Sequence, residues 1–248
     1  MQPQPGRTPP RLVAMTSADP APTPADRGGS TAARRRRRET EIITATRSLF
    51  DERGVRDAQI EDIAKAVGIN RAIVYRHFTG KEEVFSLTLV QYLDELRAVL
   101  QESADSVSQP RARLVALTEA FVDYGLAHPA FVDCAQALMR RPGGDLLEEV
   151  SESAMLRLGQ AITGCLSVVT EVLEAGVDTG DFRVADPQLL SNMLYASALG
   201  TLQLGRVAML VAEEAPGVPR ISRVTADQVR AHVVATAVAH ATGAGATV

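Results

Sequence analysis

The 248-residue sequence is poor in cysteine, histidine and aromatic residues. Its two cysteines, Cys134 and Cys165, each fall in an apolar pattern of helical spacing. That placement predicts buried, reduced thiols and argues against a disulfide framework. The four histidines are scattered and give no metal-ligand spacing, so we expect no metal site and no cofactor.

Long hydrophobic runs and catalytic motifs are also missing. Residues 1–15 hold no apolar stretch of signal-peptide length, and we expect no export, no membrane span and a cytoplasmic protein. We find no nucleophile elbow, phosphate loop, paired zinc-ligand motif or dinucleotide fingerprint, so we expect no catalytic residues. His128 and Asp133 could form an acid/base pair, but a His-Pro step at a helix start is typical of a helix boundary.

Residues 60–81 contain two short helices that meet at a turn. Apolar residues recur at three- and four-residue spacing over residues 60–67, which predicts a helix with one buried face. Gly68 is expected to end it in the left-handed conformation, and Asn70 to cap a second helix over residues 71–78. Two helices joined in this way form the helix-turn-helix unit, whose second helix enters the DNA major groove.

Basic residues follow the second of these helices. Arg71 lies in its first turn, Arg76 and His77 in its last, and Lys81 just beyond. Arginine can pair bidentately with guanine, and each such contact gives roughly 1–3 kcal/mol of discrimination. For an isolated helix pair, an ordinary solvated surface would be the alternative interpretation.

A wider pattern over residues 38–87 points the same way. Its motifs are Ile42-Ile43, Leu49-Phe50, Gly54, Ile63-Ala64, Gly68, Tyr75, His77-Phe78 and Lys81-Glu82. This run resembles the DNA-binding domain of TetR-family transcriptional regulators. It departs from the family at Ala58-Gln59, where two Ser/Thr residues are usual, and Asp57 could cap the helix instead.

The resemblance implies an all-α protein of about nine helices. An N-terminal three-helix helix-turn-helix domain would be followed by an antiparallel helical domain that binds an effector and dimerises. The expected ranges are a disordered tail over residues 1–33, a DNA-binding domain over residues 34–80 and the second domain over residues 81–248. The DNA contacts are expected from Gln59, Asn70, Arg71, Ala72, Ile73, Tyr75, Arg76, His77, Thr79, Lys81, Arg36, Arg37 and Arg38.

Five consecutive arginines occupy residues 34–38, after a Pro- and Ala-rich stretch without periodicity. The run could be a solvated tail, or a flexible basic arm that follows phosphates or reaches a minor groove. Residues 1–85 hold 15 Lys+Arg against 11 Asp+Glu, whereas residues 86–248 hold 11 against 19. The half with the helix pair is therefore the basic one, as DNA binding requires.

The rest of the chain predicts helices throughout, with no alternating strand pattern of useful length. Thr79 and Glu82 predict a capping box that opens a helix over residues 81–103. Further helices are expected over residues 111–127, 130–140, 146–175, 187–214 and 226–241, with Asp145, Asp186 and Thr225 as caps.

Two of these segments suggest binding surfaces. The helix over residues 187–214 mixes large and small apolar residues; the resemblance implies that it and the last helix form a four-helix bundle with a second subunit, and a plain intramolecular core is the alternative. Aromatic residues are scarce in the chain, but several cluster with apolar residues in the later helices, and as a group they suggest an apolar cavity for a lipophilic effector. The residues expected to bind it are Phe121, Tyr124, Phe131, Cys134, Met139, Met155, Leu158, Ile162 and Tyr195.

We therefore expect a sequence-specific DNA-binding transcriptional regulator. In the leading interpretation it is a homodimeric repressor that a small lipophilic ligand releases from a palindromic double-stranded operator. The ligand must bind the released conformation more tightly, because equal affinity for both conformations shifts nothing. The alternatives are a constitutive regulator or architectural DNA-binding protein without an effector, and an all-α enzyme.

Overall fold

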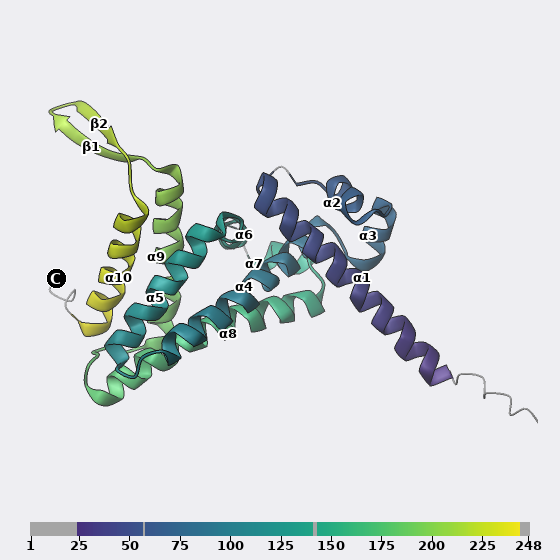
Figure 1. Ribbon diagram of the computed structural model, residues 1–248, viewed down its shortest axis with the longest axis horizontal. Helices are drawn as coiled ribbons and strands as arrows, with labels where there is room; N and C mark the ends of the chain where they lie inside the picture. The colour runs from purple at the N-terminus through teal and green to yellow at the C-terminus, as the bar shows by residue number, and fades with distance from the viewer. Residues whose placement is uncertain (1–23, 57, 141–142, 244–248) are drawn as a thin grey trace, which may run out of the picture. The chain divides into compact units, whose positions relative to one another are not determined.

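The computed structural model describes residues 24–56, 58–140 and 143–243. Most of them lie in helices, labelled α1 to α10, so the expected all-α class is confirmed (Figure 1). Residues from Arg38 onward form one compact unit, and the first part of helix α1 belongs to a separate one.

The first three helices form the predicted helix-turn-helix arrangement. They are α1 (Pro24–Arg53), α2 (Ile60–Val67) and α3 (Arg71–His77). Gly68 ends α2 with a φ of +72°, a conformation that costs a glycine little. The Asn70 side chain accepts a hydrogen bond of 2.9 Å from the Ala72 N–H and so caps α3.

A small apolar core holds these helices together. Phe50, Ile63, Val74 and Phe78 are each at most 4% exposed. The Phe50 ring also meets the Phe85 ring of the next helix edge to face, with centroids 4.6 Å apart. The helix-turn-helix therefore packs directly on the helix that follows it.

Two expectations about the N-terminal region need correction. Helix α1 begins at Pro24, so residues 24–33 are helical instead of disordered, and the arginine run is part of that helix instead of a flexible arm. Residues 1–23 and Asp57 lie outside the described residues. At the start of α2, the Asp62 carboxylate accepts from the Gln59 N–H at 3.2 Å.

The remaining helices pack mainly against one another. They are α4 (Lys81–Asp105), α5 (Pro110–Ala127), α6 (Pro129–Met139), α7 (Gly143–Glu149), α8 (Glu152–Thr179), α9 (Pro187–Val207) and α10 (Ala226–Thr242). Helix α4 packs along α8 and α5, α5 packs against α10, and α9 packs against α8 and α10 (Figure 1). Helix α8 is long and apolar enough to cross a membrane by length and composition alone, and it packs against α4, α5 and α9.

The single helix predicted over residues 146–175 is in fact two. Ser151 has extended backbone angles, φ −61° and ψ 150°, and its side chain accepts from the Ala154 N–H as the N-cap of α8. Serine can offer the backbone this alternative to a continuous helix. The predicted caps Asp186 and Thr225 are confirmed at the starts of α9 and α10.

The predicted end of α9 also needs correction. The helix stops at Val207, because Ala208 turns left-handed with a φ of +53°, and does not continue to residue 214. Strands β1 (Leu210–Ala215) and β2 (Val218–Ser222) then form an antiparallel hairpin that the sequence did not predict (Figure 1). Gly217 supplies the positive φ that its turn requires.

Candidate nucleic-acid interface and apolar cavity

Helix α3 presents one polar face to solvent. Arg71, Ala72, Tyr75 and Arg76 are exposed, while Val74 is buried on the opposite side. With 3.6 residues per turn, these four exposed residues share one side of the helix. A helix with two arginines and a tyrosine on its free side is suited to reading a DNA groove.

The Arg71 guanidinium already has two neighbours on this surface. Its Nη1 lies 2.6 Å from Glu61 Oε1, and the guanidinium carbon lies 5.7 Å from the centre of the Tyr75 ring. Both members of the ion pair are well exposed, and such pairs contribute only about 0–1 kcal/mol. Arg71 can therefore exchange Glu61 for a base edge or a phosphate at little cost.

Two predicted DNA contacts, His77 and Thr79, have polar partners within the chain, and His77 is largely covered. The His77 side chain is 15% exposed, and its Nδ1 lies 3.6 Å from Glu39 Oε1 of helix α1. The Thr79 N–H and hydroxyl each donate to Glu83 Oε2 at 2.6 Å, so the predicted capping partner, Glu82, is wrong. Helix α4 has Gly80 as its N-cap, which makes Glu83 the N3 residue that a capping interaction needs.

The other predicted contacts lie in α1 and α3 and at or next to the starts of α2, α3 and α4. Gln59 and Asn70 are exposed, and Ile73 is half-buried. Lys81 is half-buried with its Nζ 4.8 Å from the centre of the Phe85 ring. On helix α1, Arg36 and Arg37 are exposed, and Arg38 pairs with Glu41 at 2.8 Å.

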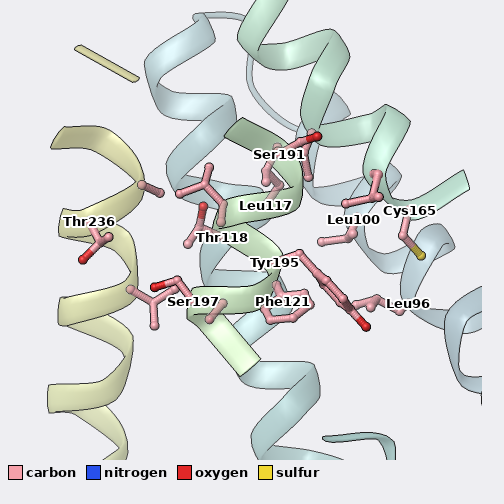
Figure 2. Close-up of a pocket in the computed structure, with 16 residues that line it drawn as sticks. Leu96, Leu100, Leu117, Thr118, Phe121, Cys165, Ser191, Tyr195, Ser197 and Thr236 are labelled. Carbon is pink, nitrogen blue, oxygen red and sulfur yellow. The ribbon is translucent and has the colours of Figure 1, made fainter. Parts of the chain in front are cut away.

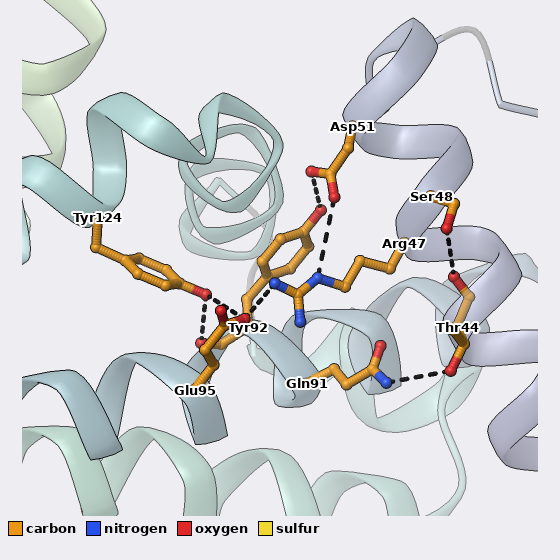
Figure 3. Close-up of polar contacts among 8 residues, drawn as sticks. All are labelled: Thr44, Arg47, Ser48, Asp51, Gln91, Tyr92, Glu95 and Tyr124. Atoms are coloured by element: carbon orange, nitrogen blue, oxygen red, sulfur yellow. Dashed lines mark hydrogen bonds and ion pairs between the residues drawn. The ribbon is translucent and has the colours of Figure 1, made fainter.

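A polar cluster joins α1 to α4 and α5 (Figure 3). Arg47 of α1 donates to the Glu95 carboxylate of α4, and the Tyr92 hydroxyl of α4 donates to Asp51 Oδ1 at 2.6 Å. The Tyr124 hydroxyl of α5 lies 3.0 Å from the Tyr92 carbonyl oxygen and 3.3 Å from Glu95 Oε2. This cluster ties helix α1 to helices α4 and α5.

Burial and charge set the ionisation of this cluster. Burial by itself would raise the pKa of Glu95, but the hydrogen bond and charge of Arg47 outweigh it and lower that pKa. Burial, reinforced by Asp51, raises the pKa of Tyr92 well above its ordinary value. At neutral pH the cluster therefore holds an ionised Glu95 and a neutral Tyr92 that donates its proton.

An apolar cavity lies between α4, α5, α8, α9 and α10 (Figure 2). Its volume is about 50 Å³. Its walls are Leu96, Leu100, Leu117, Thr118, Phe121, Cys165, Leu166, Val169, Ser191, Leu194, Tyr195, Ser197, Ala198, Val233, Thr236 and Ala237. Leu96 is the residue after Glu95, so the cavity and the polar cluster meet on the same turn of α4.

Comparison with known proteins identifies the family. Residues 42–87 match the model of bacterial regulatory proteins of the tetR family. Over 162 residues the chain is 30% identical to the transcriptional repressor KstR2 of Mycobacterium tuberculosis, covering 64% of this chain and 74% of that protein. The chain belongs to the tetR family. This TetR-family protein is accordingly a DNA-binding transcriptional regulator, and the matched residues 42–87 include the helix pair α2–α3.

Solved structures show the same fold. A complex of RolR with resorcinol gives a TM-score of 0.60 at 17% identity, covering 85% of this chain and 90% of that one. The regulator FadR from Bacillus subtilis, in complex with stearoyl-CoA, gives 0.59 at 14% identity, covering 81% and 98%. At these identities the likeness supports the TetR-family fold alone.

Only part of the predicted effector site of this TetR-family protein lines the cavity. Phe121 and Tyr195 do so, with ring centroids 6.0 Å apart. Tyr124 and Phe131 pack behind them in the core, 5.5 Å from each other. We did not predict the cavity-lining residues of α4 and α10, because no local pattern shows which face of a helix will line a cavity.

The other predicted effector residues lie elsewhere. Cys134 and Leu158 are buried outside this cavity, and Met139 is 53% exposed. Met155 and Ile162 line surface grooves along α8. Their apolar character is explained by core or surface packing.

The two thiols are buried and free, as predicted. Burial raises the pKa of the Cys165 thiol, which lines the cavity, to about 12. Its Sγ lies 3.2 Å from the Leu93 carbonyl oxygen. This thiol is therefore protonated and weakly nucleophilic at neutral pH.

The acid/base pair considered from sequence is not assembled. The His128 ring packs on the Tyr124 ring with centroids 4.4 Å apart. The Asp133 carboxylate instead accepts from Arg206 of α9. Each residue has a structural partner of its own, which argues for packing roles.

Proposed function

We propose that this TetR-family regulator is a repressor that binds a palindromic operator as a homodimer in the cytoplasm and is released by a small lipophilic effector. One observation carries the proposal: Leu96 and Leu100 of α4 line the cavity, while the same helix holds the helix-turn-helix through the Arg47–Glu95 contact. In this division residues 34–80 bind DNA, and residues 81–248 bind the effector and dimerise. The name of KstR2, a repressor, supports the sign of regulation.

The surface of α9 supports a homodimer. Leu189, Met193, Leu204 and Val207 are between 43% and 59% exposed. They fall within one sector of the helix and extend over about 27 Å at 1.5 Å per residue. An exposed apolar stripe of this length marks a contact surface, and a two-fold pair of recognition helices needs a second copy of the chain.

Small residues strengthen this interpretation. Ala196 and Gly200 lie along the same stripe and are exposed. Among the described residues, no atom lies within 4 Å of the point where a Cβ of Gly200 would be. Packing within this chain therefore gives no reason for a glycine there, whereas a closely approaching partner helix does.

The lining of the cavity supports an effector that is mostly apolar and carries a few polar atoms. Its walls are mostly aliphatic and aromatic, with hydroxyls from Thr118, Ser191 and Tyr195 among them. At about 50 Å³ it is far smaller than pockets that hold small molecules, which are roughly 300–1,000 Å³. An effector must therefore displace side chains, and displacement of Leu96 and Leu100 moves α4. The resorcinol and stearoyl-CoA complexes support a ligand in this family fold.

Binding of the full chain to DNA, followed by release with added compounds, tests the proposal. DNA selected from a randomised library would be challenged with stearoyl-CoA, with resorcinol and with a ketosteroid, the compound class in the name of the solved KstR2 structure. A matched variant, Ala198→Phe, fills the cavity from a buried wall position. We expect at least one compound to release the wild type and none to release the variant at the same concentration. Equal release of both proteins would exclude this cavity as the effector site, and release of neither would favour a constitutive regulator.

A further inference from the structure

The carboxylate of Glu83 joins two segments that are distant in the sequence, residues 79–83 and residues 149–151. Glu83 is 6% exposed. Its Oε2 accepts from the Thr79 N–H and hydroxyl at 2.6 Å each, and its Oε1 accepts from the Ser151 hydroxyl at 2.5 Å. The Thr79 hydroxyl is also 3.0 Å from the Glu149 carbonyl oxygen, so it can donate to either acceptor.

These contacts link the end of helix α3 to helix α8, which lines the cavity. Thr79 follows the last turn of the recognition helix α3, and Ser151 is the N-cap of α8. Helix α8 also supplies Cys165 and Val169 to the cavity wall. A shift of α8 would therefore reach Thr79 through the side chain of Glu83, which lies in the first turn of α4. The rest of α4 would not need to move.

Capping alone does not account for this arrangement. The local contact at the start of α4, between Thr79 and Glu83, uses only Oε2. The second oxygen is held by Ser151, 68 residues further along the chain. A buried carboxylate keeps its orientation only while its donors are in place, because charge-assisted hydrogen bonds are strong and an unsatisfied buried charge is costly. Loss of the Ser151 donor thus removes one of the interactions that orient the carboxylate and weakens its hold on Thr79.

We propose that Glu83 is a positioning residue that couples the first turn of α8 to the end of the recognition helix. When an effector shifts α8, Ser151 leaves Glu83 and the Thr79 turn loosens, which alters the pose of α3. This mechanism deepens the proposed function and rests on it. The contact between α8 and Thr79 is itself testable without DNA or effector.

Amide hydrogen exchange of the full chain is the direct test. Ser151→Ala removes the donor to Glu83 and one helix cap. The matched control, Asp186→Ala, removes the side-chain cap of α9, where Asp186 accepts from the Leu189 N–H at 2.9 Å. We expect Ser151→Ala to speed exchange over residues 71–80 roughly tenfold, as loss of a bond to a charged group would. Ser151→Thr, which keeps a hydroxyl, should restore the slow exchange, and Asp186→Ala should leave residues 71–80 unchanged.

The reciprocal experiment uses the other end of the contact. Thr79→Val keeps the shape and the backbone N–H but removes the hydroxyl, and linkage requires that it speed exchange at residues 152–156. Glu83→Gln, with one acceptor oxygen in place of two, should speed exchange in both segments.

If Ser151→Ala changes exchange only within α8, Glu83 is a local cap and the proposal is wrong. Failure of the wild type to select any DNA would instead overturn the proposed function and leave the exchange result standing.

Discussion

Arg71 and Glu61 form an ion pair between the two helices of the DNA-binding unit, with Nη1 and Oε1 2.6 Å apart. Arg71 is the first residue of α3, and Glu61 lies in the first turn of α2. Since both side chains are about 60% exposed, water screens the pair and makes it easy to break. If Arg71 contacts DNA as predicted, Glu61 competes with the nucleic acid for the same guanidinium.

Replacement of Arg71 tests its role in base reading. Arg71→Ala should relax preference at one position of each half-site by roughly 1–3 kcal/mol, because alanine cannot make the bidentate hydrogen bonds to a base. The matched variant Glu61→Gln should instead tighten binding to all sequences, since it removes a competing negative charge. Selection from a randomised DNA library gives both results. An unchanged ranking of operator variants for Arg71→Ala would show that Arg71 does not read a base.

The Tyr75 hydroxyl is expected to reach a phosphate. The residue is 48% exposed, with its ring beside the Arg71 guanidinium. Tyr75→Phe should weaken operator binding several-fold, because one hydrogen bond contributes about 0.5–1.5 kcal/mol, and leave thermal stability unchanged. Titration of the selected DNA with both proteins measures the difference. Identical affinities would make Tyr75 a packing residue.

Local signals in the sequence account for the accuracy of the helix-turn-helix prediction. Gly68, Asn70 and the apolar spacing of α2 each act within one or two turns, so they can be interpreted without knowing the rest of the fold. The inward orientation of His77 depends on Glu39 of another helix, which no local pattern shows.

Nonlocal packing also explains the errors in the second half of the chain. The cavity walls on α4 and α10 follow from which helices happen to face each other. The hairpin after α9 was missed because Ala208 takes a left-handed conformation that usually belongs to glycine, so the sequence carries no stop signal.

The Arg47–Glu95 contact predicts a pH-dependent contribution to stability. The pKa of Glu95 is lowered in the folded protein, so its pairing stabilises the fold above its unfolded pKa of about 4.3 and is lost as pH falls through the lower folded value. Glu95→Gln should reduce the free energy of unfolding at pH 7 by about 0.2–1 kcal/mol. Urea titrations should show the two proteins converging below about pH 4. A difference that is constant with pH would mean that the charge of Glu95 contributes nothing.

The arginine run predicts a salt effect. Deletion of residues 1–38 should lower operator affinity and reduce the slope of log K against log salt by about 0.9 for each phosphate that the arginines no longer neutralise. Sequence preference should change little, because interactions with the DNA backbone carry no sequence code. Substitution of all five arginines by glutamine is the matched control, since it removes the charge and keeps the length of α1. Unchanged slopes in both variants would identify the run as a solvated segment of α1.

The central claim is that two copies of α3, related by a two-fold axis, read DNA. Selection from a randomised library by the full-length protein tests it most directly, with sedimentation of the selected complex to count protomers. We predict an inverted repeat with half-sites about 10–10.5 base pairs apart, or a multiple of that spacing, bound by an even number of chains. Enrichment of no sequence, or of a single half-site bound by one chain, would contradict it.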